Sequence, residues 1–290
     1  ATPVGAFLDV WKAKPQLAPA LFSVLAKANT PDEHFALLTS VRAALDSAGL
    51  ESVGIADVEA GIPEDGWTGI RAKLPERTDQ SAWFGAHLSG IKTLEQGLTD
   101  VIVADRWGGP SGSPDLFFAP DGTALPAAYT MLPFYILELE DAVRAQVSYD
   151  GKNAASDGNG VTVLAARAPA TSHVYLIVAA ADPRFVGVNL TYQVDMTGLT
   201  PANGAWELSR AVIDAGTRSF HFSEINTVYT TTGRMLLVKN IRVPSVHYIE
   251  LIPQIAQPPE DVTSQPDVFQ DDAGAADATI PEAMAPDSAG

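Results

Sequence analysis

The first half of the chain alternates amphipathic helical segments with short apolar runs. The segment Thr30–Glu33 reads Thr-Pro-Asp-Glu, the order of an N-cap, a first helical position and an acidic first turn. Apolar residues then recur at helical spacing as far as Leu45, and Gly49 stands where a glycine commonly ends a helix. This pattern predicts one helix between Thr30 and Gly49.

Further segments of the first half continue this alternation. The apolar run Val53–Val58 comes directly after the first helix and predicts a buried strand, and Val101–Ala104 predicts a second strand. Helical spacing recurs over Ser81–Gln96 and over Pro126–Ala142. Helices that alternate with strands through short links indicate parallel βαβ units, and therefore an α/β layer or barrel.

The second half of the chain has a different period, which begins after the Gly/Asn/Asp-rich stretch Tyr149–Gly160. Turn residues there separate short runs of strand type, as expected for an antiparallel β-sandwich. These runs are Val161–Ala165, Val174–Ala179, Val188–Val194, Ala211–Ile213, Met235–Val238 and Val246–Ile252.

The C-terminal segment from Gln257 consists mainly of Ala, Asp, Pro and Gly. It offers too little apolar area to offset the entropy of ordering, so we expect a disordered acidic tail. Eight of the acidic residues that produce the formal charge of −17 lie in this segment, which leaves about −9 for the rest. A negative chain repels phosphate, so we expect neither nucleic acid nor an anionic membrane as a partner.

Composition and motifs exclude several kinds of site. The chain has no cysteine, so disulfides, thiolate metal sites and cysteine nucleophiles are excluded. The histidines lack metal-binding spacing, and no nucleotide-binding glycine motif occurs in a strand-to-helix context, so we expect no metal and no cofactor. Asp150, Asp157 and Asn159 offer oxygen ligands for Ca²⁺ without the EF-hand spacing, and a solvated linker is the simpler interpretation.

The order of these segments resembles family 39-like glycoside hydrolases, the group of β-xylosidases and α-iduronidases, over roughly residues 5–253. In the barrel part the resemblance rests on five segments: Phe22-Ser23, Thr30–Glu33, Ala44–Leu50, the strand that ends in Glu59, and Leu94–Gly97. It continues through Asp121–Tyr129 into Val161–Arg167 and Pro244–Leu251. The implied fold is the C-terminal part of a (β/α)₈ TIM barrel over residues 1–143, an accessory antiparallel β-sandwich over 144–256, and the tail over 257–290.

The resemblance implies a retaining glycosidase mechanism, in which one carboxylic acid protonates the leaving oxygen and a carboxylate attacks the sugar. Glu59, at the end of a predicted strand, matches the position of the family's nucleophile. The family's acid/base lies on an Asn-Glu-Pro turn after the fourth strand; this sequence has no such turn, and that strand would precede Ala1. From the residues alone, the simpler interpretation of Glu59 is an ordinary surface carboxylate at a strand end. Alternation predicts that Asp57 points the same way as Glu59.

The sequence departs from the family at two places near the sugar. Leu25 stands where the family usually carries a histidine, and Ala60 and Gly61 follow Glu59 where tryptophan and asparagine are usual. Both changes remove contacts to a sugar. They leave open a catalytically inactive glycosidase-like scaffold that binds carbohydrate or serves as a structural subunit of a surface assembly.

Aromatic residues near the predicted mouth of the barrel are candidates to stack on a sugar. Trp107 comes just after a predicted strand, with Arg106 beside it as a candidate for a carboxylate or hydroxyl group, and Trp67 lies in a nearby loop. Trp83 has the spacing of a core position and is expected to pack.

A half-barrel would expose strand edges and the apolar faces of its helices. We therefore expect a protein chain or a missing segment to complete the barrel. Carbohydrate is the other expected partner, and the protein is expected to be secreted or at the cell surface. The longest apolar stretches, such as Met131–Leu139, are too short to span a membrane.

Overall fold

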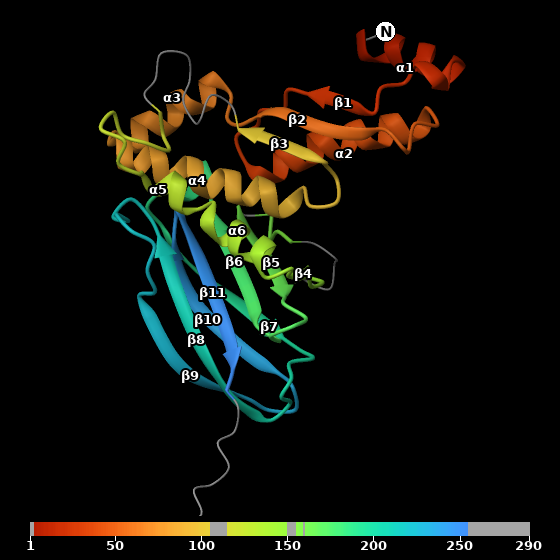
Figure 1. Ribbon diagram of the computed structural model, residues 1–290. Coiled ribbons are helices and arrows are strands. Elements are labelled where there is room, and N and C mark those ends of the chain that lie inside the picture. The colour runs from red at the N-terminus through yellow and green to blue at the C-terminus, as the bar shows by residue number, and fades with distance from the viewer. Residues whose placement is uncertain (1–2, 105–114, 150–154, 159, 255–290) are drawn as a thin grey trace, which may run out of the picture. The chain divides into compact units, whose positions relative to one another are not determined.

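A computed structural model describes residues 3–104, 115–149, 155–158 and 160–254 of the chain (Figure 1). Contacts between residues group Ala1–Ile255 into one compact unit. The predicted tail lies outside the described residues, and the boundary at residues 143 and 144 stays a prediction. Within the described part, no helix combines the length and apolar character that a membrane span needs.

The first part of the chain contains helices and a small parallel sheet. In chain order its elements are α1 (Pro3–Ala13), η1 (Pro15–Leu17), β1 (Leu21–Val24), α2 (Pro31–Ser47), β2 (Gly54–Ala60), α3 (Glu64–Lys73), α4 (Arg77–Leu94), β3 (Val101–Ala104), α5 (Pro126–Tyr129) and α6 (Leu132–Leu139). β1 and β3 both pair with β2 in parallel, in the order β1-β2-β3. The predicted parallel arrangement of βαβ units is therefore confirmed.

Helix α2 begins and ends where the sequence predicts. Oγ1 of Thr30 accepts a hydrogen bond from the backbone N of Glu33 at 3.2 Å, and Pro31 occupies the first helical position. Beyond the end of the helix, Gly49 has a φ of +74°, a conformation that favours glycine. These local signals fix the ends of α2, and buried Leu38 and Leu45 pack in one cluster with Ile55 of β2.

Helix α4 is buried over most of its length, from Ser81 to Leu94. Two glycines allow its neighbours to approach closely. A Cβ on Gly85 would lie 2.8 Å from the Cα of Ala127 in α5, and one on Gly90 would lie 2.6 Å from Cγ of Pro31 in α2. Helix α4 thus packs against α2 and α5, and also against β5, β6 and β11 of the antiparallel part.

The predicted single helix over Pro126–Ala142 is wrong, because the structure contains two short helices, α5 and α6, in that segment. The break lies at Thr130 and Met131. Pro133 has no N–H to donate to the carbonyl four residues earlier, so a continuous helix would lose that hydrogen bond.

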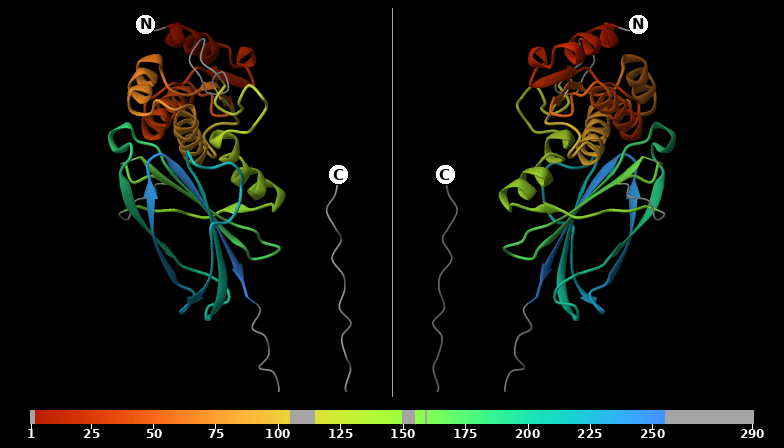
Figure 2. Two further views of the ribbon diagram at one scale, coloured as in Figure 1. Left: turned by 90° about the vertical axis from the view of Figure 1, so that its left-hand side faces the viewer. Right: turned by 90° about the vertical axis from the view of Figure 1, so that its right-hand side faces the viewer.

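The second part of the chain is antiparallel. Its strands are β4 (Val143–Arg144), β5 (Val161–Arg167), β6 (Val174–Ala180), β7 (Asn189–Met196), β8 (Gly204–Ile213), β9 (Glu224–Thr230), β10 (Met235–Arg242) and β11 (Ser245–Pro253), with the short helix η3 (Pro183–Phe185) between β6 and β7. Six strands form one sheet in the order β4-β5-β6-β11-β8-β9, and β7 pairs with β10 in a second sheet. Both sheets can be followed in Figure 2, and side chains from both belong to one hydrophobic cluster.

The two faces of the parallel sheet differ in burial. Ile55 and Asp57 of β2 are fully buried on the face that contacts α2. On the other face Leu21, Val101 and Val103 are exposed. Among the described residues β1 and β3 each pair only with β2, so both have an open edge. Parallel sheets are normally covered on both faces, whereas the described residues leave the second face of this sheet partly uncovered.

Candidate functional site

An ion pair lies at the C-terminal edge of the parallel sheet. Nζ of Lys27, three residues after β1, is 3.2 Å from Oε2 of Glu59, one residue before the end of β2. Their side chains are 31% and 42% exposed. Parallel α/β folds carry their functional residues at this edge, because the carboxyl ends of the strands meet there. We therefore take this edge as the candidate site.

A β-bulge separates Glu59 from Asp57. Asp57 pairs with Ile102 of β3 and Ala60 pairs with Ala104, so β2 has one residue more than β3 over this stretch. The extra residue places Ala60, like Asp57, in a fully buried position, while Glu59 is partly exposed. The expectation that Asp57 and Glu59 point the same way is therefore wrong, because the bulge interrupts the alternation.

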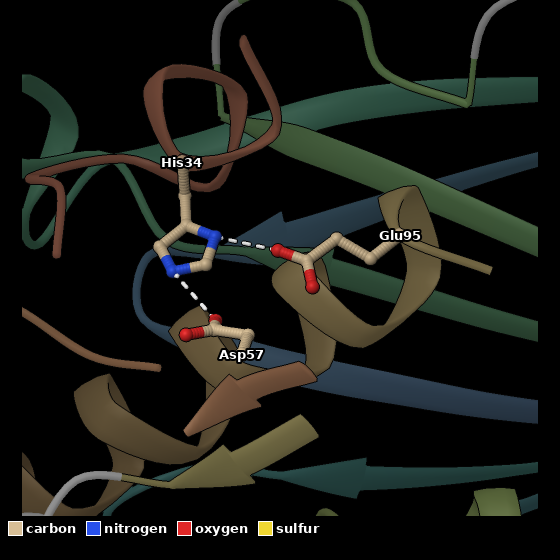
Figure 3. Close-up of side chains that lie close together, drawn as sticks. All are labelled: His34, Asp57 and Glu95. Atoms are coloured by element: carbon tan, nitrogen blue, oxygen red, sulfur yellow. Dashed lines mark hydrogen bonds and ion pairs between the residues drawn. The ribbon is translucent and has the colours of Figure 1, made fainter. Parts of the chain in front are cut away.

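Asp57 belongs instead to a buried network with His34 and Glu95 (Figure 3). Nδ1 of His34 is 2.5 Å from Oε1 of Glu95, and Nε2 of His34 is 3.1 Å from Oδ2 of Asp57. All three side chains are fully buried. His34 lies in the first turn of α2, Asp57 in the middle of β2 and Glu95 just after α4, so the network joins three elements.

The network also holds the backbone of Ala26. Nε2 of His34 lies 2.8 Å from the carbonyl oxygen of Ala26, and Oδ1 of Asp57 accepts a hydrogen bond from the N–H of Ala26 at 3.3 Å. A carbonyl oxygen only accepts, so Nε2 of His34 carries a hydrogen.

The neighbouring carboxylates favour a charged His34. Burial lowers the pKa of His34, but the hydrogen bonds and charges of Asp57 and Glu95 outweigh burial and raise it to about 9. Burial raises the pKa of Glu95, and His34 opposes that shift. Burial and then the His34 charge lower the pKa of the nearby, fully buried His87 to about 3. The two carboxyl groups beside His34 therefore favour the protonated form of its imidazole.

The donor atoms of this network do not suit a metal ion. One ligand atom from each of His34, Asp57 and Glu95 lies within 4.8 Å of the other two. However, Nε2 of His34 donates to a backbone carbonyl and Nδ1 faces Glu95 at hydrogen-bond distance. A nitrogen that holds a proton has no lone pair for a metal. We interpret the three residues as a buried charge network, in which His34 is hydrogen-bonded to Glu95 and lies at ion-pair distance from Asp57.

The spacing of the histidines along the chain does not predict this network, because they are distant from one another in the sequence. One local signal was present: Asp57 is the single acid within the apolar run Val53–Val58, and a buried carboxylate requires a partner. The identity of that partner depends on how α2 and α4 pack.

The predicted aromatic candidates have different outcomes. Trp83 is fully buried in α4, which confirms its expected place in the core. Trp67 in α3 is only 3% exposed, and the centroids of its ring and of the Phe84 ring are 5.9 Å apart. A buried indole has no free face for a sugar, so Trp67 is not part of the candidate site. Arg106 and Trp107 lie outside the described residues, so their predicted roles stay predictions.

The two sequence departures both lie beside the ion pair. Leu25, at the position of the expected histidine, is 63% exposed. Ala60 is fully buried against Trp67 and Ile70 in the hydrophobic core. Neither residue supplies a polar contact to a ligand at this edge.

Comparison with known proteins identifies the fold. No protein-family model matches the sequence, and no curated protein matches it. Solved structures do match: a glucosidase from Croceicoccus marinus superposes with a TM-score of 0.59, and a GH39 enzyme from Xanthomonas axonopodis pv. citri with 0.57. The fold of this chain is similar to part of the fold of these enzymes. A bacterial orthologue of human α-L-iduronidase, with a TM-score of 0.56, agrees with the GH39-like resemblance.

These three structures match most of the present chain at low sequence identity. Identity to these three structures is 13–14%, and 83–87% of the present chain is covered. The chain spans between 50% and 58% of the length of the three proteins. The glycosidase-like fold thus extends over most of this chain and corresponds to about half of each enzyme.

Proposed function

We propose that this chain is the C-terminal part of a carbohydrate-active protein with a retaining glycoside hydrolase mechanism, in which Glu59 is the nucleophile. The position of Glu59 carries the proposal. This carboxylate is partly exposed at the C-terminal end of the middle strand of a parallel sheet. That is where barrel enzymes place catalytic groups, and it agrees with the register of the GH39-like resemblance.

The bare face of the parallel sheet supports a completed barrel. Exposed Leu21, Val101 and Val103, together with the open edges of β1 and β3, would be covered if further parallel strands continued the sheet. We propose that a preceding segment or a partner chain supplies these strands. Under this proposal residues 1–143 are the C-terminal half of a TIM barrel and residues 144–256 are an accessory β-sandwich.

The proposed mechanism needs a second carboxyl group from the completing strands. In a retaining glycosidase that group lies about 5 Å from the nucleophile and protonates the leaving oxygen. The Glu59 carboxylate then attacks the anomeric carbon from the opposite face, which breaks the glycosidic bond and forms a glycosyl–enzyme ester. Water, deprotonated by the second group, hydrolyses this ester. Lys27 holds Glu59 in place by ion pairing.

The test is hydrolysis of aryl glycosides by the protein with its barrel completed. A panel of aryl β-xylosides, β-glucosides and α-iduronides covers the sugars suggested by the family and by the similar structures. We expect turnover with at least one of them, and a loss of about 10⁴-fold or more in Glu59→Gln, as is typical when a catalytic nucleophile is removed. Glu51→Gln, which changes an exposed carboxylate just before β2, is the matched control and should keep full activity.

A second candidate function is an inactive scaffold that binds carbohydrate. The exposed Leu25 and the buried Ala60 favour it, because neither offers the polar contacts expected around a sugar. A hollow of about 1210 Å³ between β5, β6 and β7 is large enough for a sugar, and its lining includes Arg167, Thr191 and Gln193. Binding of a glycan without turnover, unchanged by Glu59→Gln, would favour this alternative.

A further inference from the structure

We propose that the buried His34–Asp57–Glu95 network positions Lys27 against Glu59, so that these three residues are positioning residues for the candidate site. The inference deepens the proposed function and rests on it for its catalytic meaning. The geometry itself concerns only how one ion pair is held.

The buried network contacts the chain just before Lys27, at Ala26. Side chains of the network hold both polar backbone groups of Ala26: Asp57 accepts from its N–H, and His34 contacts its carbonyl oxygen at 2.8 Å. Ala26 is fully buried. The position and direction of the chain at Ala26 therefore depend on two side chains that belong to other elements.

The segment that follows Ala26 is bonded to the chain at the end of β2. Lys27 forms an isolated parallel bridge with Gly61, and the N–H of Ala28 donates to the carbonyl oxygen of Gly61 at 3.1 Å. Residues 26–28 are thus fixed beside the end of β2. The Lys27 side chain starts from this fixed backbone and reaches Glu59 at 3.2 Å.

Glu59, the other partner of the ion pair, is positioned by the bulge of β2. Glu59 lies within the bulge of β2, between Asp57 and Ala60, which are both fully buried. Asp57 therefore anchors both partners: its backbone sets the start of the bulge, and its carboxylate holds Ala26. Glu95 completes the arrangement, because it holds the opposite nitrogen of the His34 ring.

The charges in the network keep this arrangement together. His34 faces Asp57 on β2 and Glu95 after α4, and burial lowers the pKa of the nearby His87 on α4. Removal of one charged member leaves the remaining charges buried and incompletely paired, which is costly in a protein interior. The segment with Ala26 is then expected to shift, and Lys27 with it.

The experiment measures acylation of individual lysines by acetic anhydride, with mass spectrometry as the readout, in the full 290-residue chain. The rate at Lys27 is divided by the rate at Lys12, an exposed lysine of α1 that serves as internal control. Glu59→Gln should raise this ratio about two- to fivefold, the range that a partly exposed ion pair allows. Asp57→Asn and His34→Gln should raise it by a similar factor, because both side chains hold the backbone of Ala26, the residue before Lys27.

The combination of variants tests the coupling directly. If the network acts through the ion pair, Glu59→Gln adds nothing further in the Asp57→Asn background. An unchanged ratio in folded Asp57→Asn, or a full additional increase in the double variant, would overturn the proposal. Far- and near-ultraviolet circular dichroism establishes that each variant is folded.

Wild-type protein provides a second measurement that needs no network variant. As the pH rises through about 9, His34 loses its charge and the ratio of Lys27 to Lys12 should rise. In Glu59→Gln the ratio should stay flat, and identical profiles in the two proteins would contradict the proposal. Lysine acylation does not depend on glycoside turnover, so this measurement remains valid even if Glu59 is not the nucleophile. If aryl glycosides are turned over but the ratio of Lys27 to Lys12 acylation does not change, only the positioning role is refuted.

Discussion

At the scale of single residues, His34 lies at the centre of the buried network with Asp57 and Glu95. It contacts two buried carboxyl groups and a buried backbone carbonyl. His34→Gln should reduce the free energy of unfolding by about 3–5 kcal/mol, because it leaves charges buried without their partner. Urea unfolding measures this loss. His221→Gln, at an exposed position, should change the same quantity by less than about 0.5 kcal/mol, and equal effects would count against a special role for His34.

The pH dependence of stability follows from the same residue. The pKa of His34 is about 9 in the folded protein, compared with an ordinary value of 6.5. The folded state therefore binds the proton more tightly, and the stabilisation is complete below about pH 6.5 and is lost as the pH rises through about 9. Wild type should lose stability over this interval, and His34→Gln should lose markedly less. Parallel curves for the two proteins would refute the raised pKa.

Residue-scale features could be predicted from sequence only where the signal is local. Trp83 was assigned to the core from helical spacing, and Glu59 was selected from its place at a strand end and from the family register. The pairing of Glu59 with Lys27 depends on the lateral packing of two strands, and the separation of Glu59 from Asp57 depends on a bulge. Neither feature leaves a pattern in the sequence near these residues.

At the scale of elements, the close packing of α4 against α5 can be tested by a substitution at Gly85. Gly85→Ala would place a Cβ 2.8 Å from the backbone of Ala127, which cannot move independently of α5. We expect a loss of about 1–3 kcal/mol in the free energy of unfolding, the usual cost of overpacking.

Gly69→Ala in α3 is the matched control for this substitution. A Cβ there meets nothing within 4 Å, so the helix should gain up to about 1 kcal/mol from the better propensity of alanine. Thermal or urea unfolding of both variants measures the difference. A Gly85→Ala protein as stable as Gly69→Ala would show that the two helices do not approach as described.

Elements with strong local signals were predicted well, and elements without them were not. Helix α2 has a cap, an N-terminal proline and a terminal glycine, and β3 was predicted at Val101–Ala104 as observed. Strand β9 was missed because its residues are largely polar or exposed and give no apolar run. The break between α5 and α6 was missed because apolar spacing continues across it, although Pro133 marked the place.

At the scale of the whole molecule, the proposed completing strands can be tested at Leu21, Val101 and Val103, the exposed apolar residues on one face of the parallel sheet. Val103→Glu should change the stability of the isolated 290-residue chain by no more than about 0.5 kcal/mol, since Val103 is exposed there. In the protein with its barrel completed, the same change buries an unpaired charge and should cost several kcal/mol. Val238→Glu, at an exposed position of β10, should have little effect in either form. Equal tolerance of both changes in the completed protein would argue against coverage of this face.

The proposed role of Glu59 as nucleophile is tested most directly by trapping the glycosyl–enzyme ester that it would form. A 2-deoxy-2-fluoro glycoside with a good leaving group slows hydrolysis of this ester, so that the labelled peptide can be found by mass spectrometry. We expect the peptide that contains Glu59 to gain the mass of one fluorinated sugar, and Glu59→Gln to remain unlabelled. A label on a different carboxylate, or turnover of aryl glycosides that persists in Glu59→Gln, would contradict the proposal that Glu59 is the nucleophile.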